Sequence, residues 1–184
     1  ADLKRDSALF KAYQTNYSKY LDAYFQLNDI KRGQGSFGML LPDYLVMNIE
    51  FNPITRENHQ ATIEKFRNIE IREQLSSYFR LLSLVNQATD EFNELVVRES
   101  RAFFLKEENV FANERVFDST DRTFPPLKRI STIDTVKLRE TFDHEYFEPI
   151  LSQLRMSMGF YLLSLERSIE ENRGLIQSLE SKLQ

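Results

Sequence analysis

Residues 71–103 read IREQLSSYFRLLSLVNQATDEFNELVVRESRAF, a stretch without proline or glycine. A seam of mostly apolar positions runs through it in alternating steps of four and three residues: Ile71, Leu75, Tyr78, Leu82, Val85, Thr89, Phe92, Val96, Glu99 and Phe103. This spacing keeps the seam on one face of an α-helix, whereas a strand would alternate at every second residue. The pattern predicts a helix over about residues 70–111, roughly 60 Å long at about 1.5 Å per residue.

Two further seams have the same period. The first predicts a helix over about residues 2–27 and consists of Phe10, Tyr13, Tyr17, Tyr20, Tyr24 and Leu27. The last predicts a helix over about residues 145–183 and consists of Phe147, Leu151, Leu154, Met158, Tyr161, Leu165, Ser168, Asn172, Leu175 and Leu179. A second apolar line lies beside this last seam, so the final helix is expected to touch more than one neighbour.

These helices predict an all-α fold in which residues 1–184 form a single domain. We expect an elongated bundle of three long amphipathic helices with one or two short helices. Short helices are predicted over about residues 56–67, capped by Thr55, and from a cap at Thr135 or Ser131 to Phe142. The connections at residues 28–42 and 112–130 are longer than minimal bundle turns.

Composition narrows the possible functions. The 24 basic and 28 acidic residues are scattered along every segment, so no nucleic-acid-binding surface is expected. The chain has no cysteine, which excludes disulfides, thiolate nucleophiles and cysteine metal sites. No apolar run approaches the ~20 residues of a membrane span. Because the chain starts at Ala1 without an initiator methionine and enters a helical pattern at once, we expect a signal peptide or membrane anchor to precede it.

The motifs that could carry chemistry have simpler interpretations. Residues 33–38, GQGSFG, match G-x-G-x-x-G, but they follow a helix and not a strand, which favours a flexible connection over a nucleotide site. Neither His59 nor His144 belongs to a Glu-x-x-His or His-Glu-x-x-His motif. The acids around His144 are typical of a helix start. We therefore predict no catalytic residue, cofactor or metal, and a chain that is not an enzyme.

Two apolar groups are candidates for partner binding. Phe111, Phe117 and Phe124 lie in or beside a polar connection, where they either cap the end of the bundle or bind a partner. Ile176, Leu179 and Leu183 lie at the end of the last helix, which is expected to extend past its neighbours and pair with another copy as a homodimer. The tyrosines of the first helix could line a ligand pocket, although a core seam with hydroxyls at its rim is the simpler interpretation.

Residues 51–79, FNPITRENHQATIEKFRNIEIREQLSSYF, resemble a family of uncharacterised bacterial proteins that is common in Bacteroidetes. In that family a phenylalanine and a Pro-x-Thr turn precede a helix, as do Phe51, Pro53 and Thr55 here. An "elR..l..yy" pattern then follows, matched here by Glu70, Ile71, Arg72, Leu75, Tyr78 and Phe79. The resemblance implies one amino-terminal membrane helix, a helical extracytoplasmic domain and no known catalytic residues.

Together these observations predict a non-enzymatic, extracytoplasmic (periplasmic) helical domain that senses or scaffolds. It would belong to a bacterial protein anchored to the inner membrane by a segment upstream of Ala1. The alternative is a soluble coiled-coil module for protein–protein interaction.

Overall fold

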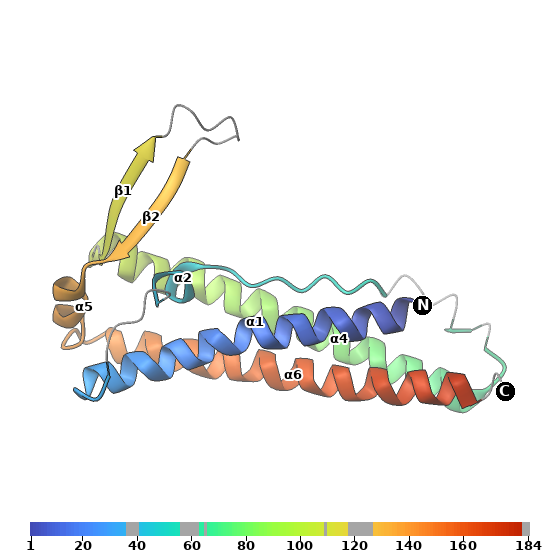
Figure 1. Ribbon diagram of the computed structural model, residues 1–184. Coiled ribbons are helices and arrows are strands. Elements are labelled where there is room, and N and C mark those ends of the chain that lie inside the picture. The colour runs from blue at the N-terminus through green and yellow to red at the C-terminus, as the bar shows by residue number, and fades with distance from the viewer. Residues whose placement is uncertain (36–40, 56–62, 65, 109, 118–126, 182–184) are drawn as a thin grey trace. The chain divides into compact units, whose positions relative to one another are not determined.

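The computed structural model describes residues 1–35, 41–55, 63–64, 66–108, 110–117 and 127–181 (Figure 1). Its helices and strands follow in the order α1 (Asp2–Lys31), α2 (Leu41–Val46), α4 (Ile69–Leu95), η2 (Val96–Ser100), η3 (Ala102–Glu107), β1 (Phe111–Phe117), β2 (Leu127–Ile133), α5 (Thr135–Thr141) and α6 (Phe147–Ser181). The chain divides into two compact units. The first unit consists of residues 1–21, 49–93 and 156–184, and the second unit consists of residues 22–48 and 94–155.

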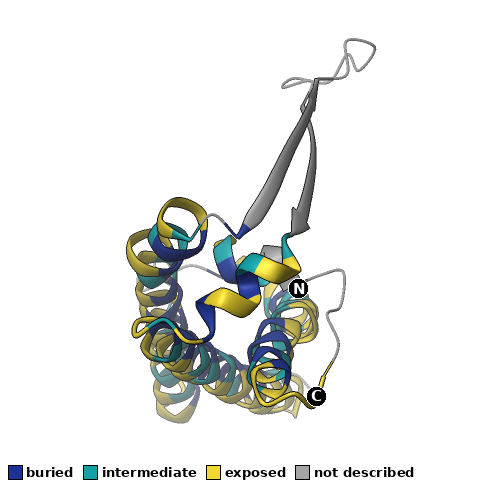
Figure 2. Cartoon of the chain, turned by 90° about the vertical axis from the view of Figure 1, so that its left-hand side faces the viewer, coloured by how far each residue is buried: buried dark blue, intermediate teal, exposed yellow. Residues whose placement is uncertain are grey.

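The predicted fold of three long helices with short helices is confirmed. α1 continues four residues past the predicted end at 27, and α6 begins at Phe147, two residues after the predicted start at 145. In Figure 2 the long helices carry buried residues on one side and exposed residues on the other. Most of the predicted short helix at 56–67 lies outside the described residues. Among the described residues, no helix has the length and apolar character that a membrane span requires.

In the first unit, aromatic rings join the three long helices. Tyr17 of α1 meets Tyr161 of α6 edge to face at 5.6 Å between ring centroids, and Tyr20 of α1 meets Phe92 of α4 at 6.3 Å. The aliphatic core between these rings comes from the predicted seams and includes Leu75, Leu82, Val85, Met158, Leu165 and Leu175. Burying such side chains contributes about 1.5–3 kcal/mol each, which makes the seams the main source of stability.

The second unit has an aromatic core of its own. Phe104 of η3 contacts Phe103 and Phe147, with ring centroids 4.9 and 6.2 Å away, and Phe142 lies 5.1 Å from Phe147. The cap of α5 corrects a prediction. Asp134, and not Thr135 or Ser131, is the N-cap, because its Oδ1 accepts the N–H groups of residues 136 and 137 at 3.0 and 3.1 Å.

The long central helix changes its winding at Val96. Residues 96–100 and 102–107 form π-helical segments, which have more residues per turn than an α-helix. The buried positions therefore step by four, from Phe92 to Val96 to Ser100 and on to Phe104, and Glu99 is exposed. The predicted seam is wrong at Glu99, because the wider turn rotates that carboxylate into solvent. Its last member, Phe103, is buried as predicted.

The connection predicted at residues 112–130 contains most of the two strands of a β-hairpin, which the sequence pattern did not indicate. β1 and β2 pair antiparallel, with Phe111 opposite Ile133 and Phe117 opposite Leu127. Val110, which is buried, ties the base of this hairpin, since its carbonyl accepts the N–H of Asp134 at 2.9 Å. Strands are common where two runs of β-branched and aromatic residues pair, but charged residues interrupt both runs here and hide the alternation.

Candidate functional site

An extended segment lies along the helices of the first unit. We call residues 49–55, which contain no helix or strand, the strap; Figure 1 shows it in teal after α2. Ile49, Phe51 and Thr55 are buried, whereas the intervening Glu50, Asn52 and Ile54 are exposed. This period of two is that of a strand with one face covered. The cover comes from helices, so the main-chain groups of the strap need partners other than a neighbouring strand.

Helix α1 supplies several of these partners from one face. The hydroxyl of Tyr17 accepts the N–H of Glu50 at 2.8 Å, and the hydroxyl of Tyr13 accepts the N–H of Asn52 at 3.2 Å. The carboxylate of Asp6 accepts the N–H of Ile54 at 2.5 Å. Steps of seven and four residues separate the three acceptors, so they lie on the same side of the helix.

Helix α4 holds the beginning of the strap. The side-chain amide of Asn93 accepts the N–H of Ile49 at 2.8 Å and donates to its carbonyl at 2.9 Å. One amide thus satisfies both main-chain groups of Ile49, as a neighbouring strand would. We call Asp6, Tyr13, Tyr17 and Asn93 together the strap site.

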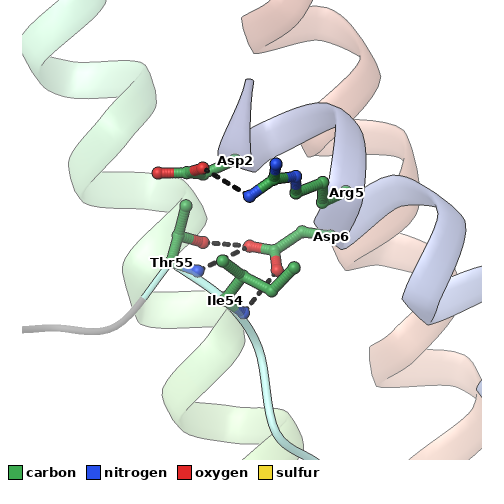
Figure 3. A network of polar contacts seen from close by, with 5 residues as sticks. All are labelled: Asp2, Arg5, Asp6, Ile54 and Thr55. Carbon is green, nitrogen blue, oxygen red and sulfur yellow. Dashed lines mark hydrogen bonds and ion pairs between the residues drawn. The ribbon is translucent and has the colours of Figure 1, made fainter.

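Asp6 is the most heavily bonded member of the strap site (Figure 3). It is fully buried, and besides Ile54 it receives the N–H of Thr55 at 3.1 Å, the hydroxyl of Thr55, and the hydroxyl of Tyr78 at 2.9 Å. Asn172 of α6 donates to the Tyr78 oxygen at 3.0 Å. A buried carboxylate is costly unless it is hydrogen-bonded, so these donors hold it in place. The arrangement anchors the strap to α1, α4 and α6.

Burial also keeps the hydroxyls of Tyr17, Tyr78 and Tyr161 protonated. Removal from water raises the pKa of Tyr78 and of Tyr161 well above the ordinary tyrosine range, and it raises the pKa of Tyr17 as well. The reason is that a buried phenolate loses its hydration. The three hydroxyls therefore remain neutral, and the hydroxyl of Tyr78 can donate a hydrogen bond to Asp6.

In the second unit, side chains also bind main-chain carbonyls at the end of α2. The last carbonyls of a helix have no partner within it. Here the hydroxyl of Tyr24 donates to the carbonyl of Tyr44 at 2.7 Å, and Ser100 donates to the carbonyl of Leu45. Arg101 donates through Nε to the carbonyl of Val46 at 2.6 Å and through Nη2 to the side chain of residue 48 at 2.7 Å. The π-helical stretch supplies Ser100, and Arg101 lies between its two segments.

The predicted partner-binding residues that the structure describes belong to β1 and α6. Phe111 and Phe117 lie on β1, and Phe124 and Leu183 lie outside the described residues. Ile176 and Leu179 lie near the end of α6 and are half-buried. The partner role of these residues stays a prediction.

The glycine motif and the histidines, which the sequence offers as candidate sites of chemistry, have structural roles where the structure describes them. Gly33 takes a positive φ of 76° where α1 ends, which suits glycine and the predicted connection. His144 packs edge to face on Phe103 at 5.1 Å, its Nε2 lies 3.6 Å from Glu108, and its Nδ1 accepts the N–H of Tyr146. His59 lies outside the described residues, among which no group of acids and histidines is close enough to hold a metal.

Sequence reasoning missed Asp6 and Asn93 as site residues. Asp6 did leave a signal, because a step of four back from Phe10 places this carboxylate on the apolar seam of the first helix.

Comparison with known protein families, with curated proteins and with solved structures finds no match to this chain.

Proposed function

We propose that this chain is a non-enzymatic helical domain that senses or scaffolds, and that it forms the extracytoplasmic part of a membrane-anchored bacterial protein. The observation that supports the proposal is the strap site, where α1 and α4 hold an extended segment through its main chain. Such contacts are typical of the way proteins hold peptide segments.

The family resemblance agrees with this proposal at one place. Its phenylalanine and Pro-x-Thr turn correspond to Phe51, Pro53 and Thr55, which all belong to the strap. Two of these residues, Phe51 and Thr55, are buried against the helices. We therefore propose that the resembling motif is the part of the chain that the helices hold.

Sensing would follow from the length of the helices. α1 and α4 each have residues in both compact units, and both bind the strap. A pull on the strap therefore acts on two helices at once, and small helix shifts are a common way to transmit a signal.

Hydrogen exchange followed by mass spectrometry tests this transmission. Phe51→Ala removes a buried ring that packs 5.4 Å from Phe10, whereas the control Ile54→Ala shortens a side chain that is 43% exposed. We expect Phe51→Ala to speed exchange along α1 as far as residues 22–31, and Ile54→Ala to leave it unchanged. Faster exchange confined to the strap would contradict the sensing proposal. Protease accessibility of the tagged full-length protein in spheroplasts tests its location.

The second candidate is a soluble coiled-coil interaction module that forms a homodimer. Ile176 and Leu179 favour it, because both are apolar yet only half-buried near the end of α6. Pairing with another copy would cover them.

A further inference from the structure

We infer that the strap site also takes an extended segment of a partner protein in exchange for the strap. The accepted segment has an apolar residue, an aromatic residue two positions later and a threonine four positions after that. This inference rests on the proposed function, because it names the kind of partner that such a domain would hold.

The contacts to the main chain make exchange chemically possible. Tyr17, Tyr13 and Asn93 bind the N–H groups of strap residues 50, 52 and 49, and Asp6 binds those of 54 and 55. Every residue except proline offers such an N–H group, so these bonds do not depend on which side chains the segment carries. Residue 53, for which the strap has proline, is not among those whose N–H is bound.

Side chains at the buried positions set the preference. The ring of Phe51 lies 5.4 Å from that of Phe10 and 6.1 Å from that of Tyr13, which suits an aromatic side chain. The hydroxyl of Thr55 donates to Asp6, so a hydroxyl is needed there. Ile49 is 1% exposed, which calls for an apolar residue. The three exposed positions, 50, 52 and 54, require only that the residue is not proline, because their N–H groups are bound.

The strap is also the outer layer of this part of the molecule. Its alternate residues Glu50, Asn52 and Ile54 are exposed, so solvent reaches it along its length. A segment with one side in solvent has a path of departure on that side. The resident strap competes with the partner through an effective concentration of about millimolar, which predicts weak binding to the intact chain.

A labelled peptide of residues 46–56, VMNIEFNPITR, tests the exchange by fluorescence anisotropy. We expect the full-length variant Ile49→Ser/Phe51→Ser, whose own strap binds poorly, to take the peptide about tenfold more tightly than the wild type does. Because that variant could lose its fold, Phe51→Leu serves as a milder second variant, for which we expect an increase of about threefold.

Two methylated peptides serve as controls. Methylation of the amide nitrogens of residues 50 and 52 removes the N–H groups that Tyr17 and Tyr13 accept, and it should abolish binding. Methylation at residue 47, outside the strap, should not. Equal binding of both methylated peptides, or no binding of the unmodified peptide to either folded variant, would overturn the exchange. The hydrogen-exchange experiment uses no peptide, so its outcome separates failure of the exchange from failure of the proposed function.

Discussion

Replacing Asp6 by asparagine tests the anchor of the strap at constant side-chain size. Oδ2 of the carboxylate receives both Thr55 donors and the Tyr78 hydroxyl, whereas Oδ1 receives the N–H of Ile54 at 2.5 Å. An asparagine would keep its oxygen toward the three donors and turn its NH₂ group toward that N–H. Two donors would then face each other, one of them on a side chain that is fully buried.

The cost follows from the bonds that change. One charge-assisted hydrogen bond worth about 1.5–3 kcal/mol disappears, and the N–H of Ile54 is left unpaired at a further cost of about 1–3 kcal/mol. We expect Asp6→Asn to lower the free energy of unfolding by about 3–5 kcal/mol. For a chain of 184 residues, each kcal/mol lowers Tm by roughly 2–4 °C, so a loss of roughly 6–20 °C should result.

Urea unfolding at neutral pH, followed by far-UV circular dichroism, measures this difference. Asp2→Asn is the matched control, because Asp2 is exposed. The ion pair that it forms with Arg5, at 3.8 Å, is exposed as well and contributes little (Figure 3). The effect of Asp2→Asn should stay within about 0.5 kcal/mol. If Asp6→Asn unfolds at the same urea concentration as Asp2→Asn, Asp6 is not a buried anchor and the account of the strap site is wrong.

Three further predictions concern the core, the pH range and self-association. Leu82→Ala should cost about 2–5 kcal/mol in urea unfolding because Leu82 is 3% exposed, whereas Glu94→Ala should stay within about 0.5 kcal/mol; a neutral Leu82→Ala would refute the seam. Since burial raises the pKa of Tyr78 and Tyr161, the folded chain keeps protons that unfolded tyrosines release above pH ~10. The contribution of these tyrosines to stability should therefore be level below about pH 10 and fall above it by up to about 1.4 kcal/mol per pH unit for each tyrosine; in Tyr161→Phe the fall should be less steep by up to that amount, and an unchanged slope would exclude Tyr161 as a cause. Sedimentation should show a dimer that Ile176→Glu weakens, and a monomer at high concentration of the unsubstituted chain would end the homodimer hypothesis.

The long helices could be predicted because their information is local and repeated. Each seam places an apolar residue at every third or fourth position over many turns, so one exception does not hide the period. Asn172 shows the limit of this reasoning. It lies on the predicted seam and is fully buried, but only the structure shows that it bonds to Tyr78, a residue 94 positions earlier.

The strap could not be predicted in the same way. Its alternation of buried and exposed residues covers only seven positions, and its partners Asp6, Tyr17 and Asn93 lie in helices before and after it in the chain. If a neighbouring strand held the strap, the sequence would contain a second alternating run. Helix side chains that bind the main chain of the strap require no such run, because nearly every residue offers an N–H group whatever its side chain.

The π-helical stretch shows a signal that was present but easily misread. The seam of alternating steps would bury the charge of Glu99, whereas a constant step of four from Phe92 reaches Val96, Ser100 and Phe104 and keeps that charge in solvent. A buried, unpaired carboxylate costs several kcal/mol, more than the poorer geometry of a wide turn. The same wide turns place Ser100 and Arg101 where they donate to the carbonyls of residues 45 and 46. Avoiding one buried charge and capping α2 therefore require the same change of winding. Asp6 needs no such change in α1, because the donors around it satisfy its buried carboxylate.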